Sequence, residues 1–198
     1  MEPLTAIDLR ELFELLNDEL RSCGTKAELF LVGGAVMCLA YGARPSTQDV
    51  DAVFRPPEEV RKAAARAASR AGISPDWLND GVKGFLSPQG EFAPFLEREY
   101  LNVMVAQPEY MLAMKCLAMR IGAEFHDEDD VRYLLRHLDI RNYEKAITAI
   151  TKYFPLERFP QKMLYALQEL LPQATDRVPA IEKEFGPRTS RSGKRDEC

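Results

Sequence analysis

The chain has 198 residues, of which 46% are hydrophobic and 29% are charged. This length and composition predict a globular protein of one sizeable domain or two small ones. The formal net charge is -5, from 26 Lys and Arg against 31 Asp and Glu, which argues against a duplex-binding surface driven by global charge. The sequence has no apolar run long enough to span a bilayer, so no membrane partner is expected.

The N-terminal segment and the cysteines favour a cytoplasmic location. The segment MEPLTAIDLRELFELL is acidic and amphipathic, unlike a secretory signal, which needs a basic start and an apolar core. The four cysteines form no CxxC pair and show no zinc spacing. A reducing compartment therefore fits best.

The N-terminal half reads as alternating helices and strands. A helix is predicted from Thr5 to Cys23, with Thr5 and Asp8 as a capping box. A strand over 29–32, a helix over 35–41 and a strand over 49–54 follow. The Ala-rich segment 57–71 predicts a further helix, which Gly72 ends.

The remaining chain reads as loops, one clear strand and then helices. Residues 73–97 show no clear period and predict loops with a short strand, whereas 101–106 predicts a strand. Helices are expected over 108–120 and 129–137, then to about 185, with a disordered tail at 186–198. The predicted fold class is α+β, with a small mixed β-sheet in an α/β core over 1–107 and a helical region over 108–185.

Two carboxylates mark the strand over 49–54. Asp49 and Asp51 are two residues apart and therefore point to the same face, with Val50, Ala52 and Val53 expected to turn inward. Unpaired, these carboxylates would repel each other and raise one pKa. A divalent cation removes this repulsion, and paired carboxylates suit Mg²⁺, or Mn²⁺, bound to substrate phosphates. The alternative is a solvent-facing strand edge with two exposed acids.

Gly33 and Gly34 lie between the first predicted strand and the next helix. Glycine lets the backbone approach a ligand closely, and the free N–H groups at the start of a helix attract phosphate. Taken alone, the pair also fits an ordinary strand-to-helix turn. Together with Asp49 and Asp51, it predicts phosphoryl or nucleotidyl chemistry.

The order of these motifs resembles the nucleotidyltransferase superfamily with the polymerase-β-like fold, in particular its AbiEii-type and minimal members. Their pattern stands here as Val32-Gly33-Gly34 followed by RPSTQDVD over 44–51, with one extra residue between Arg44 and Thr47. Two further patterns stand as KCLAMR over 115–120 and HDEDDV over 126–131. The run WLND over 77–80 is similar to members whose function is unassigned.

The resemblance implies transfer of a nucleoside monophosphate from a nucleoside triphosphate to a hydroxyl of tRNA or protein. Family members include toxins of toxin–antitoxin and phage-defence systems, so a cognate antitoxin is an expected partner. Asp49 and Asp51 would hold Mg²⁺ or Mn²⁺. The implied nucleotide-binding residues are Gly33, Gly34, Arg44, Thr47, Lys115 and Arg120, and the implied catalytic residues are Asp49, Asp51, Lys115, Asp127 and Asp130.

One feature departs from the family. Polymerase-like transferases often carry a third carboxylate on a later strand, and the strand over 101–106 offers Asn102 there. Asn cannot act as a base near neutral pH. Glu97 or Glu99, or Asp127 and Asp130, would have to substitute.

Other readings remain open for the chain as a whole. A protein that keeps the fold and binds nucleotide without turnover is one alternative, which the missing third acid motivates. A nucleic-acid-binding module built on the later helices is another, although the charges over 132–152 are strongly mixed. Trp77 is expected to be structural, and His126 and His137 are too isolated to form a metal cluster.

Overall fold

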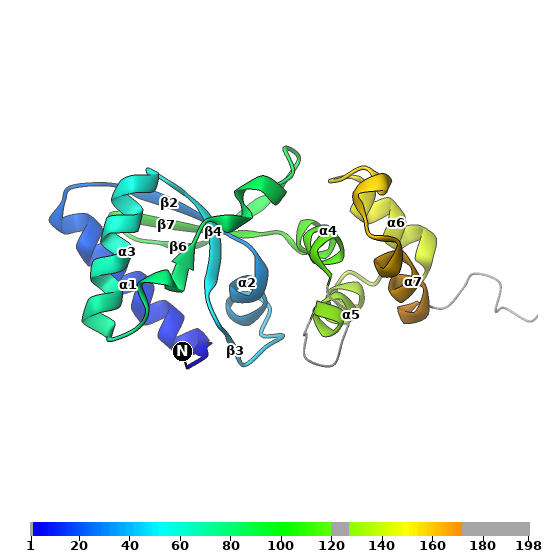
Figure 1. Ribbon diagram of the computed structural model, residues 1–198, viewed down its shortest axis with the longest axis horizontal. Helices are drawn as coiled ribbons and strands as arrows, with labels where there is room; N and C mark the ends of the chain where they lie inside the picture. The colour runs from blue at the N-terminus through cyan, green and yellow to red at the C-terminus, as the bar shows by residue number, and fades with distance from the viewer. Residues whose placement is uncertain (1, 120–126, 172–198) are drawn as a thin grey trace, which may run out of the picture.

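A five-stranded mixed sheet forms the centre of the protein (Figure 1). The computed structural model describes residues 2–119 and 127–171. The strands lie in the order β5-β4-β2-β7-β6, where β2 is antiparallel to β4 and parallel to β7. β4 and β5 are parallel, and β6 and β7 are antiparallel. Their bounds are β2 (Ala27–Leu31), β4 (Val50–Arg55), β5 (Leu78–Asn79), β6 (Phe92–Glu97) and β7 (Leu101–Ala106). The combination of this sheet with helices makes the fold α+β.

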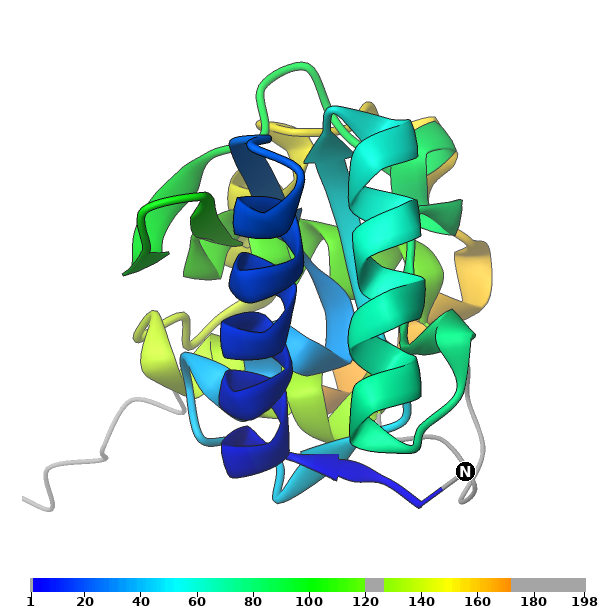
Figure 2. The same ribbon diagram turned by 90° about the vertical axis from the view of Figure 1, so that its left-hand side faces the viewer.

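Two helices lie side by side over one face of the sheet, α1 (Ala6–Ser22) and α3 (Pro57–Ala71) (Figure 2). Both match the sequence prediction closely. The capping box is present, because the Thr5 N–H donates to Asp8 Oδ2 at 2.8 Å and the Asp8 N–H donates to Thr5 Oγ1 at 3.3 Å. Gly72, with φ of 70°, ends α3 as predicted. Between them the two helices bury a row of leucines and alanines against the sheet: Leu9, Leu12, Leu16, Leu20, Ala63, Ala64 and Ala67.

The segment between β2 and β4 contains a short helix and a short strand. The helix α2 (Gly33–Leu39) begins at the first of the two glycines, directly after β2. The strand β3 (Ser46–Thr47) pairs with β1 (Leu4–Thr5) in a separate two-stranded antiparallel ribbon. In this ribbon Leu4 lies opposite Thr47, so the start of the chain is tied to the segment that leads into β4.

After β7 the described chain is helical. The helices are α4 (Pro108–Ala118), α5 (Asp127–His137), α6 (Tyr143–Thr151) and α7 (Gln161–Leu170), with a 3-10 turn, η3 (Leu156–Arg158), before α7. Figure 1 places them beyond the end of the sheet that lies opposite the turn after α1. The predictions of helix beyond 171 and of a disordered tail at 186–198 lie outside the described residues. Over 2–119 and 127–171, no helix has the length and apolar character needed to cross a bilayer.

The region over 73–97 holds more regular structure than its composition predicts. Two 3-10 turns, η1 (Pro75–Trp77) and η2 (Gly81–Phe85), flank β5, and β6 is a six-residue edge strand. The pairing of β6 with β7 shifts register between Pro94 and Leu96. Pro94 has no backbone N–H to donate to the sheet. An edge strand tolerates this at a point where the pairing is already irregular. This proline hides the strand period in the sequence.

Candidate active site

A pocket of about 680 Å³ opens between one end of the sheet and helix α4. Its walls come from four parts of the chain: the turn after β2, the segment from Arg44 into β4, the 3-10 turn η2, and the helices α4 and α5. Residues far apart in the sequence thus meet around one space. The lining residues are Val32, Gly33, Gly34, Arg44, Thr47, Gln48, Asp49, Asp51, Val82, Met111, Met114, Lys115, Ala118 and Asp127.

Both glycines are required by close approach of side chains. Gly33 has φ of 69°, and a Cβ at this position would lie 2.8 Å from Asp51 Oδ2. A Cβ on Gly34 would overlap the hydroxyl of Thr47, which is buried and donates to the carbonyl oxygen of Asp49 at 3.2 Å. The glycine pair therefore lets the backbone pass directly beside the carboxylate strand.

Asp51 stands on the face of β4 that α1 and α3 leave open. Val50 and Ala52 are fully buried on the opposite face, whereas Asp49 precedes the strand and Asp51 is half-buried. Val53 shares the face of Asp51 and is half-buried, so the prediction that it turns inward with Val50 is wrong. The strict alternation of a strand places Val53 with Asp51.

The carboxylate of Asp51 is held in an environment that favours its protonated form. Burial is the main cause that raises its pKa above the ordinary value, and the negative charge of Asp49 adds to it. A hydrogen bond from Asn79 and the positive charge of Lys115 oppose this rise. Such a carboxylate gains from any cation that enters the pocket, because the cation removes the repulsion from Asp49.

Asn79 is the site residue that sequence reasoning missed. In β5 it lies directly beside Asp51 of β4, and its Nδ2 donates to Asp49 Oδ2 at 3.0 Å. Its Oδ1 accepts from the Gly81 N–H at 3.3 Å, so both ends of the amide are engaged. The signal in the sequence was the run WLND, whose third residue is Asn79, although strand order cannot be read from it.

The strand beside the carboxylates is therefore β5 and not β7. Asn102, which the sequence offered as the counterpart of a third carboxylate, is exposed and pairs with Glu28 and Glu97 instead of a residue of β4. Glu97 and Glu99 lie at the same distant edge, where Glu99 is 3.5 Å from an Arg21 nitrogen. None of the three lines the pocket among the described residues.

Two positively charged side chains of the pocket, Arg44 and Lys115, contact one buried carboxylate, that of Asp130. Arg44 makes a two-pronged contact with Asp130, with Nε to Oδ1 at 2.7 Å and a second nitrogen on Oδ2. Lys115 Nζ lies 2.7 Å from the same Oδ2 and 3.4 Å from Asp127 Oδ1. Asp130 is 2% exposed, so it forms the floor beneath these two cations and does not face the pocket itself. Lys115 is buried too, at 9% exposed.

The structure thus brings most of the sequence-predicted residues to one place. Gly33, Gly34, Arg44, Thr47, Asp49, Asp51, Lys115 and Asp127 line the pocket, and Asp130 supports it from below. Arg120 and His126 lie outside the described residues. Trp77 is fully buried and its indole N–H donates to the Ala64 carbonyl at 3.1 Å, which is a structural role. His137 stacks on Tyr133.

The carboxylates of the pocket fit a metal ion that takes its remaining ligands from a bound substrate and water. In the described part of the chain, no group of three or more His, Cys, Asp or Glu side chains could hold a metal by itself. Mg²⁺ is usually bound by one or two carboxylates, with substrate phosphates and water completing its shell. Asp49 and Asp51 match this partial set.

Comparisons with protein-family models, curated proteins and solved structures found no match for this chain.

Proposed function

We propose that this protein is a Mg²⁺- or Mn²⁺-dependent nucleotidyltransferase that moves a nucleoside monophosphate from a nucleoside triphosphate to a hydroxyl acceptor. The observation that carries the proposal is the convergence of a glycine turn, two carboxylates and two cations on one pocket. The pocket volume of about 680 Å³ lies within the range of small-molecule sites, roughly 300–1,000 Å³. The polymerase-β-like core and the helical C-terminal region belong to this proposal.

The carboxylates and the cations would divide the work on the triphosphate. Asp49 and Asp51 would hold the divalent ion, which supplies charge neutralisation at the phosphates when it is bound. Lys115 would place a positive charge near the phosphate oxygens, and Arg44, which contacts the same carboxylate of Asp130, would add a second beside it. The Gly33 and Gly34 backbone would let the phosphates lie close to the strand.

The transfer itself is an in-line displacement. The acceptor oxygen forms a bond to the α-phosphorus, the bond from that phosphorus to the bridging oxygen breaks, and pyrophosphate leaves with the electron pair. The acceptor proton passes to a base. Both carboxylates are buried, Asp127 at 5% and Asp130 at 2% exposed, but of the two it is Asp127 that lines the pocket, where Lys115 Nζ lies 3.4 Å from its Oδ1. We assign the base to Asp127 and a positioning role to Asp130.

The test is transfer of label from α-phosphate-labelled nucleoside triphosphates. Each of the four common ribonucleoside triphosphates would be incubated with the full chain and Mg²⁺ or Mn²⁺. One arm of the experiment would contain total tRNA and the other lysate protein. Asp51→Asn is expected to lower the rate about 10³-fold, because the ion loses one of two charged ligands. Glu28→Gln, an exposed carboxylate change on β2, is the matched control and should leave the rate unchanged. Absence of transfer by the native chain in every arm would contradict the proposal.

A second candidate is a nucleotide-binding protein without turnover. The neutral Asn79 beside Asp51 favours it, because an acid there would add a third charge to the ion site. Calorimetry separates the two candidates. This second protein would bind triphosphate with Mg²⁺ and release no pyrophosphate, whereas a transferase would release pyrophosphate in step with labelled acceptor.

An acceptor on tRNA or protein and a cognate antitoxin are the further parts of the proposal. Both parts rest on the resemblance of the motifs. The two arms of the labelling experiment distinguish a tRNA acceptor from a protein acceptor. Co-expression with the product of a neighbouring gene would test the antitoxin, with growth of the host as the readout.

A further inference from the structure

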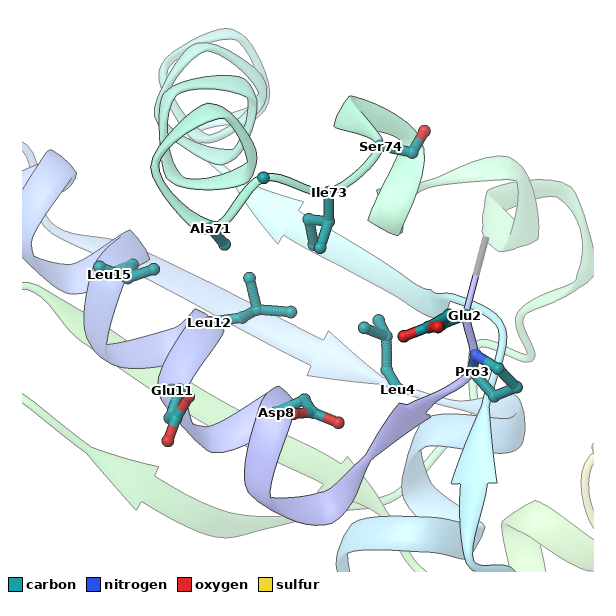
Figure 3. A pocket seen from close by; sticks show the side chains of 11 residues that line it. Glu2, Pro3, Leu4, Asp8, Glu11, Leu12, Leu15, Ala71, Ile73 and Ser74 are labelled. Atoms are coloured by element: carbon teal, nitrogen blue, oxygen red, sulfur yellow. The ribbon is translucent and has the colours of Figure 1, made fainter.

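A second pocket lies on the opposite side of the sheet from the candidate active site, and no function described above uses it. It has a volume of about 820 Å³ and lies between the start of α1 and the turn that follows α3 (Figure 3). We call it the α1–α3 groove. Its lining is Glu2, Pro3, Leu4, Asp8, Glu11, Leu12, Leu15, Ala71, Gly72, Ile73 and Ser74.

The floor of the α1–α3 groove is apolar. Leu12 lies between Leu15 and Leu4, with Ala71 and Ile73 across from them, as the side chains in Figure 3 show; Leu4 and Leu12 are themselves buried. Ile73 and Leu15 are half-buried, so the floor keeps apolar surface in contact with solvent. Burying such surface under another molecule is favourable in proportion to its area.

The rim of the groove carries only negative charge. Glu2, Asp8 and Glu11 supply three carboxylates, and the lining as described includes no Lys or Arg. Hydrogen bonds from Thr5 lower the pKa of the Asp8 carboxyl, so this group stays ionised. Burial by a neutral or acidic partner would strip water from these carboxylates without compensation, whereas a cationic partner would pair with them.

An exposed isoleucine, Ile7, lies beside the acidic rim of the groove. Ile7 is 70% exposed, the highest value among the large hydrophobic residues noted as exposed over the described ranges. It lies four residues before Glu11 on α1, and therefore on the same side of the helix.

We propose that the α1–α3 groove binds a lysine- or arginine-bearing amphipathic segment of a partner protein. Its apolar side chains would cover Leu15 and Ile73, which are half-buried, and its cations would face Glu2 and Glu11. Charge complementarity around an apolar floor selects this occupant. This proposal is independent of the proposed nucleotidyl transfer.

The probe is a fluorescein-labelled 14-residue helical peptide of leucine and lysine, titrated into the full chain. A peptide with glutamate in place of lysine and one with serine in place of leucine are the peptide controls. We expect the leucine–lysine peptide alone to bind, with amide resonances of Leu12, Leu15 and Ile73 shifting in the NMR spectrum. Shifts confined to other parts of the protein would overturn the proposal.

The protein variants test the rim directly. Glu2→Lys/Glu11→Lys is expected to weaken binding about tenfold, since each exposed ion pair accounts for a few-fold in affinity. The control Glu28→Lys/Glu157→Lys makes the same charge change at exposed positions outside the groove and should leave the dissociation constant unchanged. Equal binding by both double variants would contradict the proposal. A concentration-dependent dimer that Leu15→Asp abolishes without peptide would show a second copy as the occupant, and would overturn it too.

Discussion

The two faces of the central sheet are built by the same strands and serve different ends. On the covered face, Val50, Ala52 and Phe54 of β4 are buried, and Arg61 of α3 lies over the Phe54 ring. On the open face, Asp51 and Val53 alternate with them and stay half-buried, and the candidate active site lies at the end of this face. Because side chains alternate along a strand, one six-residue segment supplies both core and site. Substitutions on the open face should therefore change binding with smaller effects on packing, except where a buried ion pair is broken.

The largest expected effect comes from such an ion pair. Asp130→Asn leaves Arg44 and Lys115 without the charge that holds them in a buried place. We expect the free energy of unfolding to fall by about 3 kcal/mol, measured by urea denaturation. The control is Glu128→Gln on the same helix, because Glu128 pairs with Arg132 at a surface where both side chains are more than 40% exposed. That change should cost less than about 1 kcal/mol. Equal losses for the two variants would show that Asp130 is no more than a surface acid.

The next effect tests the close packing around the glycine turn. Gly34→Ala places a methyl group on the Thr47 hydroxyl, and we expect a loss of about 1–2 kcal/mol in unfolding free energy. The double variant Gly34→Ala/Thr47→Ala removes the overlapping oxygen and should recover most of this loss. Gly84→Ala, at a position with open space around it, should change stability by less than about 0.5 kcal/mol. No recovery in the double variant would contradict the packing described at this turn.

A smaller effect is expected at Asn79, and it separates β5 from β7. Asn79→Ala removes the hydrogen bond to Asp49 and is expected to weaken Mn²⁺ binding in the presence of triphosphate about tenfold. Asn102→Ala removes the same side chain from β7, where it is exposed, and should leave the affinity unchanged. Electron paramagnetic resonance of free Mn²⁺ measures both. The reverse order of effects would place the functional amide on β7 after all.

The smallest effect is on stability and depends on pH. Burial and the charge of Asp49 raise the pKa of Asp51, so the folded state holds this proton more tightly than the unfolded state. The stabilising contribution is complete below the unfolded pKa and is lost as the pH rises through the folded pKa. Metal-free Asp51→Asn should therefore melt about 1–3 °C above the native chain at pH 7 and close to it in acid. A lower melting temperature at pH 7 would show that Asp51 is stabilising when charged.

Local features of the fold could be predicted from the sequence, whereas the order in which the strands lie side by side in the sheet could not. The capping box at Thr5, the end of α3 at Gly72 and the run from β2 to β4 follow from patterns a few residues long. The neighbour of β4 depends on how distant segments pair. The sequence pointed to Asn102 because its strand has a clear alternation, whereas the two-residue β5 with Asn79 shows none.

The candidate site was predicted in its residues more fully than in their roles. Asp49, Asp51 and both glycines were recognisable from spacing, and the pocket gathers them. The motif marked Lys115 as a nucleotide-binding residue but did not show its surroundings, because α4 is packed on nearly all sides and buries Lys115 against Asp130. Only the arrangement of α4, α5 and the segment that carries Arg44 shows that Asp130 contacts Arg44 and Lys115 at once.

The pairing of β1 with β3 has a practical consequence for handling the protein. Leu4 lies opposite Thr47, and Thr47 packs against Gly34 at the wall of the candidate active site. A purification tag fused just upstream of Glu2 would sit within a few residues of this ribbon and could pull on it. Recombinant material for assays is therefore better tagged at the other end, or freed of an upstream tag by protease before any rate is recorded.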